Sequence, residues 1–484
     1  MAKRTAVIDI GSNSVRLVIF ERTSRFAFHL LHEAKSRVRI SENAYDNEGN
    51  LQKVPLQRAF SALKDFNNMI RQYKVNKTLC VATSALRDAP NKKEFIQKVQ
   101  KELSLNIKVI EGEREAYLGG IAAANLLYLN TALTIDIGGG STEFAFYQDK
   151  QVQQTFSLNL GTVRLKELYF DNDDIIGAKE YIQKELQKLP SNLHCDNLIG
   201  IGGTLRAISK MIMEKDQVSF QKLHGFAYQV TKQKNYFQKI QASNEKELLA
   251  LGVKKDRLDV LQAGLLILSS VIESMEVKQI ITSGVGVREG LFLSDLLRSQ
   301  HDRFPNNYNP SVKSLLDRFS QDKGSYLVEE SSKLFDLMAD KLELDAIYKK
   351  TFILAIKLSQ IGKELDFYES HRHAYYILLN GLNYGFSHEE TVLIACLVRY
   401  QRKKQPNKAH LQKYQDYLPK TKITNALGFL MRLSLDLFND FRHQEGFELK
   451  LEKDTLKIKA KDAYLLKEKI NDLYNNDFIK LKLL

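Results

Sequence analysis

Two short segments of the chain have almost the same sequence, and each lies between two apolar runs. Residues 9–14 are Asp-Ile-Gly-Ser-Asn-Ser, and residues 136–142 are Asp-Ile-Gly-Gly-Gly-Ser-Thr. The β-branched flanks predict a strand, a tight glycine turn and a second strand in both places. Glycine allows positive φ or the close approach of a ligand, and consecutive N–H groups in such a turn form a concave anion site. One copy could be an ordinary hairpin. Two matched copies predict a phosphate site, with each aspartate placed to hold Mg²⁺ or a water beside it.

Strands and helices alternate on both sides of the second glycine segment. A helical spacing over residues 55–73 leads to a buried strand at 78–83, and a second round of strands and helices fills residues 133–299. Such alternation is typical of an α/β layer. We therefore predict two α/β lobes, residues 1–124 and 125–300, with a cleft between them.

A polar stretch with two prolines, residues 299–311, is typical of a linker. Beyond it, residues 315–437 show helical periodicity almost throughout, and residues 447–451 and 455–459 alternate as a short hairpin. The third predicted domain, residues 311–484, is therefore mainly helical. Three domains also agree with a length of 484 residues.

The chain has 71 basic and 58 acidic residues, a formal charge of +13. This balance favours polyanionic partners, although a generally basic composition would give the same charge. No zinc-finger or RNA-binding aromatic signature accompanies it, so we expect no specific nucleic-acid partner. Three cysteines, Cys80, Cys195 and Cys396, are too few for a disulfide framework and fit a reducing compartment. Without a signal peptide or an apolar run of spanning length, we expect a cytoplasmic protein with no membrane partner.

Three further segments carry side chains suited to phosphate chemistry. Glu111, Glu113 and Glu115 crowd the start of one predicted helix, where the helix dipole alone also favours acidic residues. Arg87 follows a strand and could bind phosphate bidentately or form a surface ion pair. The Gly-Gly-Thr turn at residues 202–204 precedes a helix, whose N-terminus is an anion site, but could also be a plain connection.

On these motifs the chain resembles the exopolyphosphatase and guanosine pentaphosphate phosphohydrolase family, within the wider group of actin-like (ribonuclease-H-like), sugar-kinase-like ATPase folds. The resemblance covers residues 9–291 and implies two actin-like lobes around a cleft. The family pattern Gly-x-Glu-Glu-Ala, whose second Glu acts as base on the attacking water, matches residues 112–116, Gly-Glu-Arg-Glu-Ala. The resemblance therefore makes Glu115 the general base. Arg114 replaces the first Glu of the pattern and adds positive charge near the site.

The resemblance also implies which residues bind Mg²⁺ and phosphate. Asp9, Asp136 and Glu143 match the family's metal residues. Together with the Gly-Gly-Thr turn described above, the predicted phosphate-binding set is Ser12, Asn13, Arg87, Gly138, Gly139, Ser141, Thr142, Gly202, Gly203 and Thr204. The expected partners are inorganic polyphosphate or guanosine pentaphosphate, and a second copy of the chain in a homodimer.

Less closely, the helical part resembles the family's metal-phosphohydrolase-like module. A working module uses a His-Asp pair as metal ligands, but Ser359 and Gln360 stand in that place. We therefore expect a degenerate His-Asp-type module without metal, in which His371 and His373 are structural or bind an anion. Residues 398–404 could extend a basic track for a long substrate, or form a solvated helix end.

The predicted function is that of a Mg²⁺-dependent exopolyphosphatase, which removes the terminal phosphate from inorganic polyphosphate. The glycine turns would hold the terminal phosphoryl group, and Glu115 would orient and deprotonate water for in-line attack. The nearest alternative keeps this mechanism with guanosine pentaphosphate as the main substrate. An alternative of another class is an actin-like ATP-binding switch or a sugar kinase, and a kinase would need its acidic base elsewhere.

Overall fold

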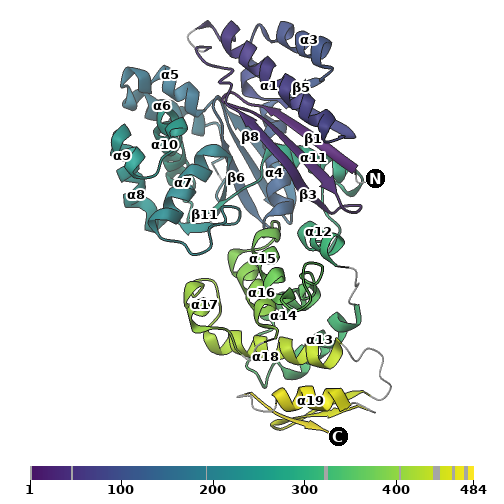
Figure 1. Ribbon diagram of the computed structural model, residues 1–484. Helices are drawn as coiled ribbons and strands as arrows, with labels where there is room; N and C mark the ends of the chain where they lie inside the picture. Colours follow the sequence, from purple (N-terminus) through teal and green to yellow (C-terminus); the bar gives the residue numbers. More distant parts are fainter. Residues whose placement is uncertain are drawn as a thin grey trace. The chain divides into compact units, whose positions relative to one another are not determined.

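The computed structural model describes residues 3–44, 47–191, 193–320, 325–402, 405–439, 447–460, 464–473 and 478–484. The chain forms two compact units, Met1–Pro310 and Ser311–Leu484. The first unit contains two β-sheets with their covering helices, and the second is mainly helical (Figure 1). The predicted fold class, two α/β lobes followed by a mainly helical region, is confirmed.

The first lobe is built on a sheet with the strand order β3-β2-β1-β4-β5. Its strands are β1 (Lys3–Ile10), β2 (Val15–Arg22), β3 (Phe28–Ser36), β4 (Lys77–Ala82) and β5 (Ile107–Val109). β1, β2 and β3 pair antiparallel, whereas β4 and β5 continue the sheet in parallel. Its helices are α1 (Lys53–Gln72), α2 (Ser84–Asp88) and α3 (Lys92–Leu103). Helix α1 covers the sheet because Ala59, Leu63, Phe66 and Ile70 recur every three to four residues and share one buried face.

The second lobe repeats this topology on a sheet with the order β10-β11-β9-β6-β7-β8. Its strands are β6 (Ala132–Ile137), β7 (Thr142–Gln148), β8 (Gln151–Leu158), β9 (Asn197–Ile201), β10 (Ala227–Gln229) and β11 (Gln279–Thr282). β6, β7 and β8 pair antiparallel, and β9 and β11 add in parallel on the other side of β6. In each sheet one central strand, β1 or β6, pairs antiparallel on one side and parallel on the other. The aspartate of the repeated sequence, Asp9 or Asp136, lies next to the end of that strand.

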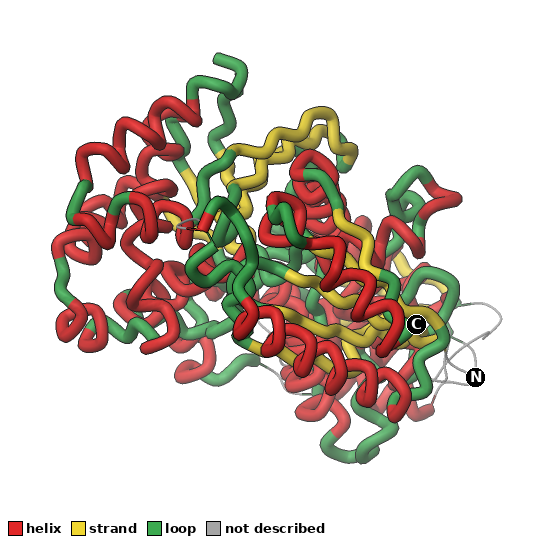
Figure 2. The backbone as a smooth tube through the Cα atoms, turned by 90° about the horizontal axis from the view of Figure 1, so that it is seen from above, coloured by secondary structure: helices red, strands yellow, loops and turns green. Residues whose placement is uncertain are grey.

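Helices flank the strands of the second lobe (Figure 2). They are α5 (Thr162–Leu168), α6 (Ile175–Leu186), α7 (Gly202–Lys215), α8 (Val230–Ala242), α9 (Glu245–Ala250) and α10 (Leu258–Met275), with the 3₁₀ turns η2 (Phe170–Asn172) and η3 (Lys255–Arg257). Among the described residues, one segment, Lys255–Met275, is apolar and long enough to cross a membrane by length and composition. Most of its apolar residues lie in the core of this lobe, and core helices pass the same test.

Two helices pack between the lobes, α4 (Gly112–Leu126) and α11 (Val287–Leu296), the latter followed by η4 (Arg298–Gln300). They approach closely, because a Cβ on Gly290 would overlap the carbonyl oxygen of Leu118. Helix α4 also lies tight on the second sheet, where a Cβ on Gly120 would come 2.8 Å from the Cβ of Ala145. The small residues of α4 thus allow close contact with a sheet as well as with a helix.

The segment predicted as a linker makes specific contacts with α4. The hydroxyl of Tyr117 donates to Asp302 at 2.9 Å, and the side chain of Asn125 binds the backbone of Asp302 and Phe304. Its polar composition therefore reflects side-chain hydrogen bonds as well as exposure. The helix that follows begins at Pro310.

The second unit consists of helices around one core, with a small sheet near its end. The helices are α12 (Pro310–Phe319), α13 (Ser325–Met338), α14 (Ile347–Leu358), α15 (Ser370–Gly381), α16 (His388–Tyr400), α17 (Lys408–Lys413), α18 (Thr421–Phe438) and α19 (Tyr464–Leu473). The strands β12 (Glu448–Glu452), β13 (Thr455–Lys459) and β14 (Lys480–Leu483) form the sheet β12-β13-β14. The hairpin predicted from the alternating sequence corresponds to β12 and β13.

Candidate active site

The two glycine turns lie against each other where β1 and β6 end. A Cβ on Gly139 would come 2.9 Å from the Cβ of Ser12, so the turns are in direct contact. The same hydrogen bond closes both turns, from Gly11 N to Ser14 O at 3.2 Å and from Gly138 N to Ser141 O at 2.9 Å. Residues of both lobes consequently line one cavity of about 150 Å³. The predicted site residues that line it are Asp9, Ser12, Asn13, Glu115, Asp136, Gly138, Gly139, Ser141, Gly202, Gly203 and Thr204.

In these two turns glycine allows neighbouring groups to approach the backbone closely, and none of the turn glycines has a positive φ. The positive-φ glycines among the described residues lie outside both hairpin turns. Instead, the carbonyl of Gly139 accepts the N–H groups of Val163 and Arg164, and a Cβ on Gly161 would overlap the backbone of Gly139. Of the two uses of glycine considered from sequence, positive φ does not occur in these hairpin turns, and the close approach seen here is to neighbouring backbone and to Ser12.

The Gly-Gly-Thr turn before α7 closes against the end of β6. Gly202 has a φ of +88°, a conformation that favours glycine, and a Cβ there would overlap Oδ1 of Asp136. A Cβ on Gly203 would overlap the guanidinium of Arg257, which therefore lies over the turn. The turn thus places the N-terminus of a helix of 14 residues at the cavity.

The three carboxyl groups of the cavity, those of Asp9, Asp136 and Glu115, are buried, and burial makes their charged forms less favourable. Burial raises the pKa of Asp9, and it raises the pKa of Asp136 to about 6. Burial and, beyond it, the nearby Glu143 hold the pKa of Glu115 well above its usual range, while Arg87 acts in the opposite direction. Protons or cations are therefore needed to neutralise this part of the cavity.

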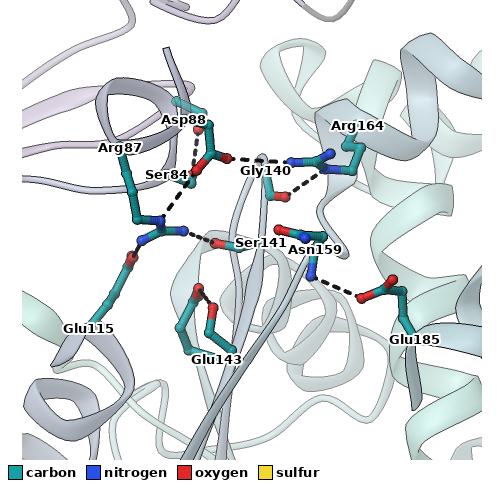
Figure 3. Close-up of polar contacts among 12 residues, drawn as sticks. Ser84, Arg87, Asp88, Glu115, Gly140, Ser141, Glu143, Asn159, Arg164 and Glu185 are labelled. Carbon is teal, nitrogen blue, oxygen red and sulfur yellow. Dashed lines mark hydrogen bonds and ion pairs between the residues drawn. The ribbon is translucent and has the colours of Figure 1, made fainter. Parts of the chain in front are cut away.

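Arg87 connects the predicted base to the second glycine turn (Figure 3). Its Nη1 lies 3.2 Å from Oε2 of Glu115 and also donates to the carbonyl of Ile110, and its Nη2 donates to the hydroxyl of Ser141 at 3.4 Å. A further ion pair joins Arg87 to Asp88 at 3.4 Å. The side chain is largely buried, so the alternative of an exposed surface ion pair does not hold.

Three predicted site residues, Arg87, Thr142 and Glu143, do not line the cavity. Thr142 is fully buried, and its hydroxyl donates to the carbonyl of Leu160. Glu143 is also buried and accepts a hydrogen bond from Ser157 at 3.0 Å (Figure 3). Burial raises the pKa of Glu143 to about 8, although Ser141 and Ser157 stabilise its charged form. Thr142 therefore holds the backbone at Leu160, and Glu143 contacts Ser157 on the neighbouring strand β8 and not the cavity.

Four arginines that the sequence analysis did not select line the cavity. They are Arg16 on β2, Arg206 on α7, Arg257 in η3 and Arg288 on α11. Burial lowers the pKa of Arg206 to about 10, and burial together with Arg288 lowers the pKa of Arg16. Arg288 is paired with Glu33 at 2.8 Å. Three of the four follow a glycine turn within four residues, a spacing that could have indicated them.

Arg114 points away from the cavity. Its Nη2 donates to the hydroxyl of Ser294 on α11 at 3.2 Å, and its guanidinium lies 4.8 Å from the ring centre of Tyr117. It is exposed and is not among the residues that line the cavity. The substitution of Arg114 for a glutamate therefore changes the contact between α4 and α11.

The model of the Ppx/GppA phosphatase family matches residues 17–299, more than half of the chain. The chain belongs to this family. A second model, that of domain III of the Ppx/GppA phosphatases, matches residues 309–483. This Ppx/GppA protein is therefore a hydrolase that acts on phosphoanhydrides, which decides against the kinase and the ATP-binding switch.

Solved structures support the fold of the first unit. The Aquifex aeolicus member of the Ppx/GppA family is 29% identical, with a TM-score of 0.54, and the match covers 62% of this chain and 100% of that chain. An exopolyphosphatase from Cytophaga hutchinsonii is 24% identical, with a TM-score of 0.56, over 61% of this chain and 98% of that one. At that identity the second likeness shows the fold alone.

In domain III the predicted degenerate module lies on buried helix ends. Ser359 is buried, and its carbonyl accepts a hydrogen bond from Gln401 at 3.1 Å. His371 is buried as well, with Nδ1 unpartnered, and burial together with Arg399 lowers its pKa. His373 on the same helix is partly exposed. The absence of metal from this module, with His371 and His373 structural or anion-binding, stays a prediction.

The structure describes residues 398–402 of the segment considered either as a solvated helix end or as a basic track. Arg402 donates to the carbonyls of Phe367 and Tyr368, so this guanidinium holds a neighbouring turn. Lys403 and Lys404 lie outside the described residues.

Proposed function

We propose that this Ppx/GppA protein is an exopolyphosphatase that hydrolyses the terminal phosphoanhydride of inorganic polyphosphate, with Glu115 as the general base on water. The observation that carries the proposal is the position of Glu115. Its carboxylate lines the cavity that the two glycine turns form, and it is held there by Arg87 at 3.2 Å. Backbone N–H groups of both turns and the N-terminus of α7 would receive the terminal phosphoryl group.

The raised pKa of Glu115 suits proton transfer at neutral pH. Burial and the neighbouring Glu143 raise that pKa, so the carboxylate accepts a proton more readily than an exposed glutamate does. Arg87 acts in the opposite direction and favours the ionised carboxylate. Glu115 would take the proton of the attacking water, and the guanidinium of Arg87 beside it would add positive charge next to the second glycine turn.

Mg²⁺ fits the carboxylates of the cavity. No group of three or more His, Cys, Asp or Glu residues that could hold a metal ion alone occurs within the described part of the chain. Mg²⁺, however, keeps several waters and uses one or two carboxylates together with substrate phosphates. Asp9 and Asp136 would hold it, with Glu143 behind them, and it would neutralise charge on the phosphoryl oxygens.

The composition of the cavity wall favours an inorganic chain over a nucleotide. Serines, glycines, carboxylates and four arginines dominate the described residues that line it, and none of these residues is aromatic. A guanine base is usually held by stacking on an aromatic ring or by shape-specific polar contacts. A polyphosphate chain needs only cations and N–H donors, which are present.

The proposal is tested by comparing Glu115→Gln with Glu113→Gln. Glu113 lies two residues earlier on α4 and is exposed, so its variant makes the same chemical change outside the cavity. We expect Glu115→Gln to lower kcat for phosphate release from polyphosphate by about 10³-fold, with polyphosphate binding retained. Glu113→Gln should keep wild-type turnover. Full turnover of Glu115→Gln would contradict the mechanism.

The same assay decides the substrate. Phosphate release is measured from polyphosphate, guanosine pentaphosphate and ATP at equal phosphate concentration, and we expect the highest kcat/KM for polyphosphate. A higher value for guanosine pentaphosphate would favour the nearest alternative. The predicted homodimer and cytoplasmic location are tested separately, by light scattering of the purified protein and by cell fractionation.

A further inference from the structure

A cluster of ion pairs joins the two lobes beside the cavity. Arg37 and Arg39 follow β3 in the first lobe, and Asp259 lies in the first turn of α10 in the second. Nη2 of Arg39 lies 2.6 Å from Oδ2 of Asp259, and Nη2 of Arg37 lies 3.5 Å from Oδ1. One carboxylate thus holds two guanidinium groups of the opposite lobe.

Asp259 does not use all the donors of the two arginines, although Nη1 of Arg39 also lies 3.7 Å from Oε1 of Glu42 in the first lobe. Nε of Arg37 and Oδ1 of Asp259 are both buried without a hydrogen-bond partner. Each guanidinium carries five N–H donors in a planar fork that matches phosphate oxygens as well as it matches a carboxylate. A ligand with more oxygens than Asp259 could therefore satisfy Arg37 and Arg39 better.

The cluster continues the cationic wall of the cavity. Arg257 lines the cavity two residues before Asp259, and Lys35 lies two residues before Arg37. Burial lowers the pKa of Lys35 to about 8, and the neighbouring Arg16 and Arg257 act in the same direction. Burial also lowers the pKa of Arg257, with Arg16 and Arg37 as further causes. These side chains are therefore close enough to repel one another, as expected for a row of cations that receives a polyanion.

The segment that carries these arginines is attached to the first glycine turn. The backbone N–H of Arg39 donates to the carbonyl of Asn13 at 3.0 Å, and that of Ser41 donates to the carbonyl of Ser12 at 3.4 Å. Asn13 and Ser12 both line the cavity. The segment that carries Arg39 is therefore bound to residues of the cavity wall, although Arg39 itself is not among the residues that line the cavity.

We propose that Asp259 is an internal competitor of the substrate, whose carboxylate takes the place on Arg37 and Arg39 that inner phosphoryl groups of a long polyphosphate chain occupy. This inference rests on the proposed function and adds the residues that set the preference for chain length. Short substrates end before the cluster and leave the carboxylate in place. Long chains displace it, because several phosphate oxygens replace one carboxylate.

The test compares variants whose effects on KM differ between the two possible roles of Asp259, a structural bridge and a competitor of the substrate. If Asp259 only joins the lobes, then Asp259→Asn and the double variant Arg37→Gln/Arg39→Gln remove the same bridge and shift KM in the same direction. If Asp259 competes, the two shift KM in opposite directions. For long-chain polyphosphate we expect KM to fall about five-fold in Asp259→Asn and to rise about five-fold in the double variant. With tripolyphosphate both shifts should be smaller.

Matched controls come from a second ion pair between distant elements. Lys77 on β4 pairs with Asp295 on α11 at 2.5 Å, outside the residues that line the cavity. Asp295 also lies 3.9 Å from Arg298, so Asp295→Asn and the double variant Lys77→Gln/Arg298→Gln repeat the two changes in net charge. KM for long chains should stay within about two-fold of wild type in both. Equal shifts in these controls would show that net charge alone is responsible, and the inference would be overturned.

Binding in the absence of turnover separates this inference from the proposed function. Isothermal titration of long-chain polyphosphate and tripolyphosphate into each variant is carried out in EDTA. A wild type that binds polyphosphate in EDTA but does not hydrolyse it when Mg²⁺ is supplied would contradict the proposed function only. Opposite shifts in the dissociation constant would still support competition by Asp259, and parallel shifts or none would overturn it.

Discussion

Nη1 of Arg87 lies 3.2 Å from Oε2 of Glu115, and the same guanidinium reaches the hydroxyl of Ser141 in the second glycine turn. Arg87 comes from α2 in the first lobe, whereas Ser141 belongs to the second. The position of the predicted base is therefore linked to both lobes through one side chain. An occupant of the cavity that attracts Arg87 would also change the electrostatic environment of Glu115.

Arg87→Gln should slow turnover and move its pH dependence. The positive charge of Arg87 lowers the pKa of Glu115, so its removal raises that pKa further. Because the ionised form is the base, the acid limb of the kcat profile should move to higher pH, and kcat at neutral pH should fall about 100-fold. Arg87→Lys keeps the charge and should leave the limb closer to its wild-type position. A limb that stays in place in Arg87→Gln would contradict the ion pair's role.

Glu143 should make the metal-free protein less stable as pH rises. Its pKa in the folded protein is about 8 against 4.5 for an ordinary glutamate, so the folded state binds more protons than the unfolded state between these values. The stabilising contribution is present below about pH 4.5 and is lost as pH rises through 8. In EDTA, the Tm of wild type should therefore fall relative to that of Glu143→Gln when the pH is raised from 6 to 8.5. Calorimetry at both pH values measures it, and a constant difference would contradict the raised pKa.

The glycine turns and Glu115 could be predicted from sequence because each depends on residues that are neighbours in the chain. A turn such as residues 136–142 contains its own strand ends, so its local structure follows from about ten residues. Glu115 is singled out among the three acids at the start of α4 only by the resemblance of residues 112–116 to the family pattern. The pairing of the two turns followed from their repetition.

Proximity to a glycine turn could have indicated three of the four arginines of the cavity, but not that all four meet at one site. Arg16, Arg206, Arg257 and Arg288 come from four elements that only the tertiary fold brings together. The role of Thr142 depends on a partner outside its turn, because its hydroxyl donates a hydrogen bond to the carbonyl of Leu160. Long-range partners of this kind leave no local pattern in the sequence.

Gly139→Ala should damage the site by separating the two turns. A Cβ on Gly139 would lie 2.9 Å from the Cβ of Ser12, closer than two carbon atoms normally approach, and backbone rather than a flexible side chain would have to move. We expect kcat/KM for polyphosphate to fall at least about ten-fold and the free energy of unfolding to fall by about 1–3 kcal/mol. Phosphate release and denaturant unfolding measure the two effects.

Gly428→Ala is the control for Gly139→Ala. A Cβ there would meet nothing within 4 Å, and the residue lies on α18 in domain III. Alanine is the better helix former, so this variant should keep its activity and gain up to about 1 kcal/mol in stability. Similar losses of activity in both variants would show that the contact between the turns is not the cause.

Arg114→Glu restores the residue that the family pattern has at this position, and we expect little effect on catalysis. The guanidinium of Arg114 contacts Ser294 and Tyr117 outside the cavity, so its replacement removes one hydrogen bond and a ring contact at the surface. The free energy of unfolding should fall by less than about 1 kcal/mol, and kcat should stay within about two-fold of wild type because a solvent-exposed charge is well screened from Glu115. The acid limb of the kcat profile is the sharper measurement, since a new negative charge close to Glu115 would move it to higher pH. A clear shift would mean that residue 114 acts on the base during turnover, and that the contact with α11 is not its main role.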